Sequence, residues 1–150
     1  MFPFRFGRGG CNHPAMSVDP AMMIPVQALV RFMASGEARH LDGVFCGRTT
    51  IVENFPPFLF EGPHAAGRWR EGFAEHALRH GLEDLQASFG PAQDVRREGG
   101  LAYFALPTRW TGRSHGRPFE ETGGWGFVLA LEEGAWRIRA YGWAVTGMAG

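Results

Sequence analysis

The spacing of apolar residues changes along the chain, and this change limits the possible folds more than any other feature. In the first half, apolar side chains recur at helical intervals, as Val26, Leu29, Val30 and Met33 do at i, i+3, i+4 and i+7. From Leu82 onward, apolar and polar residues alternate, which is typical of strands with one buried face. Helices followed by a run of strands predict an α+β domain in which helices cover one face of a sheet.

Glycines and prolines divide the two halves into individual elements. The expected helices cover residues 25–35, 37–46 and 68–80. The expected strands cover residues 48–55, 82–89, 92–98, 101–111, 118–131 and 136–145. The chain therefore predicts three helices packed on a strongly curved, mostly antiparallel sheet. We expect residues 24–150 to form this single domain and residues 1–23 to be a poorly ordered tail.

The charged residues exclude several classes of function. Acidic and basic residues number 15 each, and a protein without a basic excess is not expected to bind nucleic acid. All 15 basic residues are arginine, so the chain has no lysine for Schiff-base chemistry or for a Walker-type phosphate loop. No apolar run approaches the roughly 20 residues that cross a membrane, and no membrane partner is expected.

The two cysteines, Cys11 and Cys46, form no CxxC pair and are too few for a zinc–thiolate site. We interpret them as free thiols of a cytoplasmic protein, with a single disulfide as the alternative. The N-terminal segment has no continuous apolar core, so it is not interpreted as a signal peptide. No cofactor is expected.

The order and spacing of the segments resemble the nuclear transport factor 2-like superfamily, which includes the SnoaL-like and ketosteroid isomerase families. The resemblance rests on the first helix ending in SGEARHLDGVF, the following TIVENFPP, WREGF in the third helix and WRIRAYGW in the last strand. It covers about residues 24–146. It implies a cone-shaped α+β barrel with a pocket between the concave sheet and the helices, and a homodimer formed through the convex face.

Within the ketosteroid isomerases, the resemblance implies a carboxylate base at the end of the first strand. Glu53 falls on that position, or Asn54 if one gap is allowed. The oxyanion donors of that family are a tyrosine and a protonated aspartate. Their positions fall on Leu29 and at or beside Trp125, which cannot act as acids. This departure argues against steroid isomerase activity.

Strand alternation also singles out Glu53. In the strand expected over 48–55, it shares the more apolar face with Ile51 and Phe55. A carboxylate buried on such a face has a raised pKa and can act as a general base or acid. The alternative is an ordinary ion pair with Arg68 or Arg48.

Three histidines are candidates for a second role. His76 and His80 lie four residues apart on a helix and could bind zinc together with His64. No carboxylate of an HExxH motif lies between them, so we interpret them as histidines at the rim of the core and predict no metal site. His64, His76 and the Trp125 indole N–H are instead the expected donors to a developing enolate.

Two adjacent glutamates point to opposite faces of their strand. Glu121 shares the face of Trp125 and can enter the pocket. Cross-strand pairing of one of the two, Glu120 or Glu121, with Arg109 or Arg113 is the more ordinary alternative.

The apolar alternation predicts a pocket for a small apolar ligand. The expected lining residues are Phe55, Trp69, Phe73, Phe104, Thr108, Trp110, Trp125 and Phe127. One hypothesis is an enzyme of isomerase, cyclase or dehydratase type that transfers a proton on a small cyclic apolar substrate. The other is a non-catalytic ligand-binding or dimerisation domain. An open cavity around an unpaired Glu53 favours the first, and a cavity filled by Trp69 and Trp125 favours the second.

The last strand is expected to place Arg139, Tyr141 and Trp143 on the convex face of the sheet. Exposed aromatic patches on a sheet commonly mark an interface. The small residues of the neighbouring strand that would allow close approach are Gly124, Gly126 and Ala130. These residues together predict a homodimer.

Overall fold

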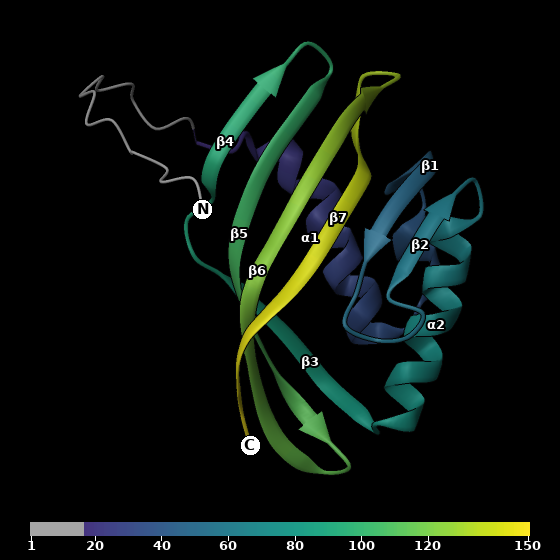
Figure 1. Ribbon diagram of the computed structural model, residues 1–150, viewed down its shortest axis with the longest axis vertical. Coiled ribbons are helices and arrows are strands. Elements are labelled where there is room, and N and C mark those ends of the chain that lie inside the picture. The colour runs from purple at the N-terminus through teal and green to yellow at the C-terminus, as the bar shows by residue number, and fades with distance from the viewer. Residues whose placement is uncertain (1–16) are drawn as a thin grey trace, which may run out of the picture.

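The computed structural model describes residues 17–150 (Figure 1). Residues 1–16, which hold Cys11 and most of the expected tail, lie outside the described residues. The helices are α1 (Pro20–Ser35), the short 3-10 helix η1 (Ala38–Leu41) and α2 (Ala65–Arg79). The strands are β1 (Phe45–Val52), β2 (Leu59–Gly62), β3 (Leu82–Phe89), β4 (Gln93–Glu98), β5 (Leu101–Ser114), β6 (Arg117–Glu132) and β7 (Ala135–Ala149). No helix in this part of the chain is long and apolar enough to span a membrane.

All seven strands belong to one sheet, which confirms the predicted α+β class. The strand order is β2-β1-β7-β6-β5-β3, and β4 pairs with β5. Only the β1–β7 pair is parallel, so the sheet is mixed. The long strands β5, β6 and β7 bend strongly along their length (Figure 1). The sheet does not close into a full barrel, because its edge strands β2 and β3 are not paired with each other; α2 packs against both of them.

The described part has two α-helices rather than the three that the spacing predicts. The segment expected as a second helix over 37–46 forms only the turn of η1, and Gly43 with a φ of 70° then redirects the chain. Val44 accepts a hydrogen bond from the Ile138 backbone N–H at 2.7 Å, at the start of the pairing between β1 and β7. Val44 and Phe45 thus belong to the pairing of β1 with β7, and Leu41 ends η1, so these apolar residues do not form one helical face.

The first helix begins at Pro20, five residues earlier than the spacing predicts. Asp19 caps it, because its side chain accepts a hydrogen bond from the backbone N–H of Ala21 at 3.0 Å. Pro20 occupies the first helical position, where a missing N–H is harmless. Pro25, expected in the first turn, therefore lies inside the helix.

A bulge in β7 changes which side chains face the core. Ile138 pairs with Leu129 and Ala140 pairs with Val128, so Arg139 between them has no partner. One extra residue shifts the alternation of the strand by one step. Tyr141 is therefore 3% exposed and faces the core together with Trp143. The prediction that Tyr141 and Trp143 lie on the convex face is wrong for this reason; Arg139 alone of the three is exposed there.

A second bulge, near the end of β7, lies beside Gly123 of β6. A Cβ atom at Gly123 would lie 2.2 Å from the Ala144 carbonyl oxygen and 2.7 Å from Cη2 of Trp143. Glycine is thus needed here because β7 and the Trp143 indole occupy the space of any side chain.

Substitution of Gly123 tests whether β6 and β7 approach each other as closely as the structure shows. Gly123→Ala should lower the free energy of unfolding by about 1–3 kcal/mol, because the added methyl group forces the two strands apart. Gly47→Ala, at an exposed position of β1 with no atom within 4 Å of its Cβ position, should change it by less than about 0.5 kcal/mol. Urea unfolding followed by tryptophan fluorescence measures both. Equal effects of the two substitutions would contradict the close approach.

Candidate functional site

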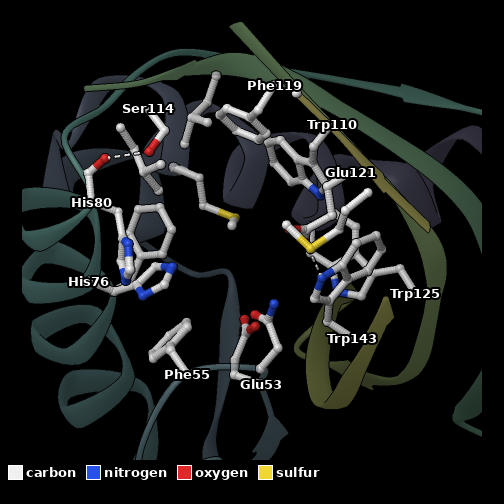
Figure 2. Close-up of a pocket in the computed structure, with 17 residues that line it drawn as sticks. Glu53, Phe55, His76, His80, Trp110, Ser114, Phe119, Glu121, Trp125 and Trp143 are labelled. Carbon is white, nitrogen blue, oxygen red and sulfur yellow. Dashed lines mark hydrogen bonds between the residues drawn. The ribbon is translucent and has the colours of Figure 1, made fainter. Parts of the chain in front are cut away.

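A cavity of about 350 Å³ lies between α2, β3 and the concave face of the sheet (Figure 2). Its walls come from α1, the end of β1, α2, β3, β5, β6 and β7. Most of the lining is apolar or aromatic. Its polar side chains are Glu53, Asn54, His76, His80, Ser114 and Glu121, together with the indole N–H groups of its tryptophans. The lining contains no arginine.

Half of the ligand-binding residues expected from the sequence line this cavity. These are Phe55, Phe73, Trp110 and Trp125. The other four are buried in the core and do not line it: Trp69, Phe104, Thr108 and Phe127. Trp69 lies behind Glu53 as a hydrogen-bond donor, so it supports the site and does not fill it.

Glu53 follows directly after β1 and its side chain is buried. Its backbone N–H donates to the Phe58 carbonyl at 3.0 Å, which fixes the start of the loop between β1 and β2. Its Oε1 accepts two hydrogen bonds, one from Trp69 Nε1 at 3.0 Å and one from the Tyr141 hydroxyl. Figure 2 shows the carboxyl group directed into the cavity. Both side-chain donors use Oε1, so Oε2 has no side-chain partner within residues 17–150.

No cationic side chain within the described residues forms an ion pair with Glu53. Arg68 donates to the Glu61 carbonyl at 2.8 Å instead, and Arg48 is exposed. Burial raises the pKa of Glu53 to about 7. Hydrogen bonds from Tyr141, Trp69 and the Asn54 backbone act in the opposite direction and lower it. The carboxyl group is thus poised to gain or lose a proton near neutral pH.

Tyr141 is the functional residue that reasoning from the sequence missed. Burial, together with the neighbouring Glu53 carboxylate, raises its pKa well above the ordinary value for tyrosine. The hydroxyl therefore keeps its proton and remains a donor to Glu53. A strict alternation along β7 places it on the wrong face, and no residue around Arg139 signals the bulge that moves it inward.

The three histidines have different surroundings. His76 stacks on Phe55 with ring centroids 4.8 Å apart, and its centroid is 4.6 Å from that of His80. Both line the cavity, and desolvation lowers the pKa of His76, with His80 and Arg79 acting in the same direction. His64 is exposed at the start of α2 and does not line the cavity. Within residues 17–150, no group of three or more side chains could hold a metal ion.

The two adjacent glutamates of β6 are separated by strand alternation. Glu120 is on the outside and accepts two hydrogen bonds from Arg109, at 2.7 and 2.9 Å. Glu121 lines the cavity, where its Oε1 accepts a hydrogen bond from Trp143 Nε1 at 2.9 Å. The Trp125 indole N–H is buried and has no hydrogen-bond partner among the described residues.

Comparison with known proteins identifies the fold. No protein-family model and no curated protein matches the sequence. Solved structures do match. A hexachlorocyclohexane dehydrochlorinase (LinA type 2) has a TM-score of 0.71 at 7% identity over 86% of this chain and 85% of that one. A putative scytalone dehydratase from Novosphingobium aromaticivorans has a TM-score of 0.70 at 11% identity over 86% and 84% of the two chains.

A nuclear transport factor 2-like protein from Salmonella enterica has a TM-score of 0.67 at 14% identity, over 84% of this chain and 89% of that one. The chain therefore has the nuclear transport factor 2-like fold, as its resemblance to that superfamily implies. Identities this low show the fold and not the activity.

The raised pKa of Glu53 predicts a pH-dependent loss of stability. The folded protein holds the proton up to about pH 7, whereas the ordinary pKa is 4.5. The folded state therefore binds more protons than the unfolded chain between these values, and its stability falls as the pH rises through this window. Relative to Glu53→Gln, the unfolding free energy of the wild type should fall by roughly 2–3 kcal/mol between about pH 5 and pH 8.

Urea unfolding at a series of pH values measures this difference. Glu61→Gln, at an exposed glutamate of β2, is the control and should keep a constant offset from the wild type. A constant offset for Glu53→Gln as well would show that Glu53 ionises as it does in the unfolded chain.

Proposed function

We propose that the protein is an enzyme that moves a proton on a small, largely apolar ring compound, with Glu53 as the catalytic base. The observation that carries this proposal is a buried carboxyl group that faces an open cavity, has two side-chain hydrogen-bond donors and has no cationic partner among the described residues. A carboxylate kept only for structure is commonly neutralised by an arginine, and this chain has 15 arginines available. Trp69 and Trp125 leave the cavity open, which favours an enzyme over a passive binding domain.

The arrangement of donors suggests how the proton moves. Glu53 Oε2 takes a proton from a substrate carbon, and the electron pair of that C–H bond passes to an adjacent carbonyl oxygen or expels a leaving group. The two donors on Oε1 hold the carboxyl group in place. The protonated Glu53 then returns its proton to a second carbon in an isomerisation, or releases it to the leaving group or to water in an elimination. Both kinds of reaction therefore need only this one carboxyl group.

A developing oxyanion requires a hydrogen-bond donor. The Trp125 indole N–H, which has no partner among the described residues, is one candidate, and His76 is the other. It lines the cavity and its lowered pKa favours the neutral imidazole, which still carries one N–H. The exposed His64 is not part of this proposal. An elimination reaction is also the kind that the names of two similar structures describe, a dehydrochlorinase and a putative dehydratase.

The catalytic proposal can be tested without the natural substrate by two generic probes. The first is 5-nitrobenzisoxazole, which loses a C–H proton while its N–O bond breaks. The second is 2-tetralone, whose α-hydrogens exchange for deuterium from heavy water. We expect at least one probe to react with the wild type at a rate that rises with pH and levels off above about pH 7, since the base works in its ionised form.

Absorbance and proton NMR follow the two reactions. Glu53→Gln should lower the rate by about 10²-fold or more, and Glu61→Gln should leave it unchanged. The catalytic proposal fails if neither probe reacts faster with the wild type than with Glu53→Gln, and ligand binding without catalysis is then the better description.

We also propose that the protein is a homodimer joined through the convex face of the sheet. Tyr141 and Trp143 do not support this, because they face the core. The support comes from Gly124, Gly126 and Ala130, whose small size permits close approach, and from Leu101 and Tyr103 nearby on β5, which are 52% and 40% exposed.

Light scattering at micromolar concentration tests the dimer. We expect a mass of about twice the 16.6 kDa of one chain. Ala144→Arg places a charged side chain at an exposed position of β7 on this face and should give a monomer. Glu71→Arg, on the exposed side of α2, should not change the mass. A wild-type protein with the mass of one chain would rule the dimer out.

A further inference from the structure

The charge of the cavity limits the ligands that can enter it. Its lining includes two carboxyl groups, Glu53 and Glu121, and no arginine from residues 17–150. The basic side chains of the lining are His76, whose pKa desolvation lowers, and His80. A ligand carboxylate or phosphate would lose its hydration there without gaining an arginine, which is strongly unfavourable. The cavity is therefore suited to a neutral or positively charged molecule.

The end of the cavity around Glu121 is built from aromatic side chains of three adjacent strands. Glu121 pairs directly with Trp110 on β5 and with Met148 on β7, and both of these line the cavity. Trp125 lies between Trp110 and Trp143, with ring centroids 5.9 and 6.2 Å away. Figure 2 shows these three indoles and Phe119 grouped around Glu121, across the cavity from His76 and His80.

Glycines of the neighbouring strands make this grouping possible. The Trp143 ring extends over Gly123, where any Cβ atom would collide with it. Its indole N–H thereby reaches Glu121 Oε1, and no side chain in the described part of the chain bonds Glu121 Oε2. Gly112 gives similar room to Phe119, because a Cβ atom there would lie 3.1 Å from its ring. The fold thus places one carboxylate oxygen, free of side-chain partners, among electron-rich rings.

We propose that Glu121, with Trp110, Trp125, Trp143 and Phe119, forms a binding site for the ammonium group of a small amine whose apolar body extends toward Glu53. Aromatic rings attract a cation through their negative faces, and a carboxylate among them supplies the counter-charge. This inference rests on the cavity of the proposed function and names its ligand class as aryl-alkyl amines. It does not depend on Glu53 being a base.

Glu121 is better suited than Glu53 to bind the ammonium group. Glu53 is buried and already receives hydrogen bonds from Trp69 and Tyr141, and burial there disfavours the charged form. Glu121 is half-buried at the cavity wall, with one side-chain donor on Oε1. An ammonium group held at Glu121 leaves the apolar body of the ligand in the rest of the cavity, whose lining includes Glu53.

A matched set of three ligands tests whether the cavity prefers aryl-alkyl amines. The compounds are 2-phenylethylamine, 2-phenylethanol and 3-phenylpropionate, which have similar apolar bodies and are cationic, neutral and anionic at about pH 8. Titration calorimetry on the wild-type protein should show the amine binding about tenfold or more tightly than the alcohol, and no measurable binding of the carboxylate. An alcohol or carboxylate that binds as tightly as the amine would overturn the proposal.

Two neighbouring glutamates provide the matched variants. Glu121→Gln should weaken amine binding about tenfold and leave alcohol binding unchanged. Glu120→Gln removes the same charge one residue away on the outer face, and should change neither. Loss of amine binding in both variants, or in neither, would contradict a site at Glu121.

Glu53→Gln separates this inference from the catalytic proposal. It should abolish the reaction of the generic probes and keep the affinity for 2-phenylethylamine within about threefold of the wild type. If the probes do not react but the amine binds through Glu121, the catalytic proposal fails and the amine site stands. If Glu53→Gln removes amine binding and Glu121→Gln does not, the cation belongs at Glu53 and the amine site is wrong.

Discussion

The hydrogen bonds to Glu53 are the constraint on which the rest of the site depends. A carboxyl group at this depth needs partners, because an isolated buried charge is very costly. Trp69 of α2 and Tyr141 of β7 supply them, so one oxygen atom joins the end of β1 to a helix and to the neighbouring strand. Burial raises the pKa of this carboxyl group to about 7, and the two donors, which carry no charge, lower it only in part.

The bulge at Arg139 decides whether this arrangement can exist. Without the extra residue, Tyr141 and Trp143 would point to the convex face, and Glu53 and Glu121 would each lose a donor. Bulges commonly redirect side chains next to functional sites. Here the bulge turns Tyr141 and Trp143 inward, where they donate to Glu53 and Glu121 respectively. One extra residue in β7 therefore positions the donors of both carboxyl groups of the cavity.

Alternation in the sequence predicts which face of the sheet a side chain is on. It does not predict whether that position along the strand lies at the cavity or in the packed core. It places Glu53 with Ile51 and Phe55, and Glu121 with Trp125. It cannot separate the pair Trp110 and Glu121 at the cavity from the pair Phe104 and Phe127, which is fully buried elsewhere in the same two strands. The bulge in β7 and the start of β1 at Phe45, inside the helix expected over 37–46, both depend on pairing with distant residues, which local spacing does not reveal.

The separation of charges between the two faces of the sheet explains how an arginine-rich chain can keep a carboxyl group that forms no ion pair within residues 17–150. Adjacent residues in a strand point in opposite directions, so Glu120 meets Arg109 on the outer face while Glu121 faces the cavity. Arg113 likewise pairs with Asp84 and Glu83 at the edge strand β3. An arginine inside the cavity would lower the pKa of Glu53 and hold it as a permanent anion, a weaker base at neutral pH. Keeping arginine out of the cavity is therefore the condition for both a tunable proton at Glu53 and a free negative charge at Glu121.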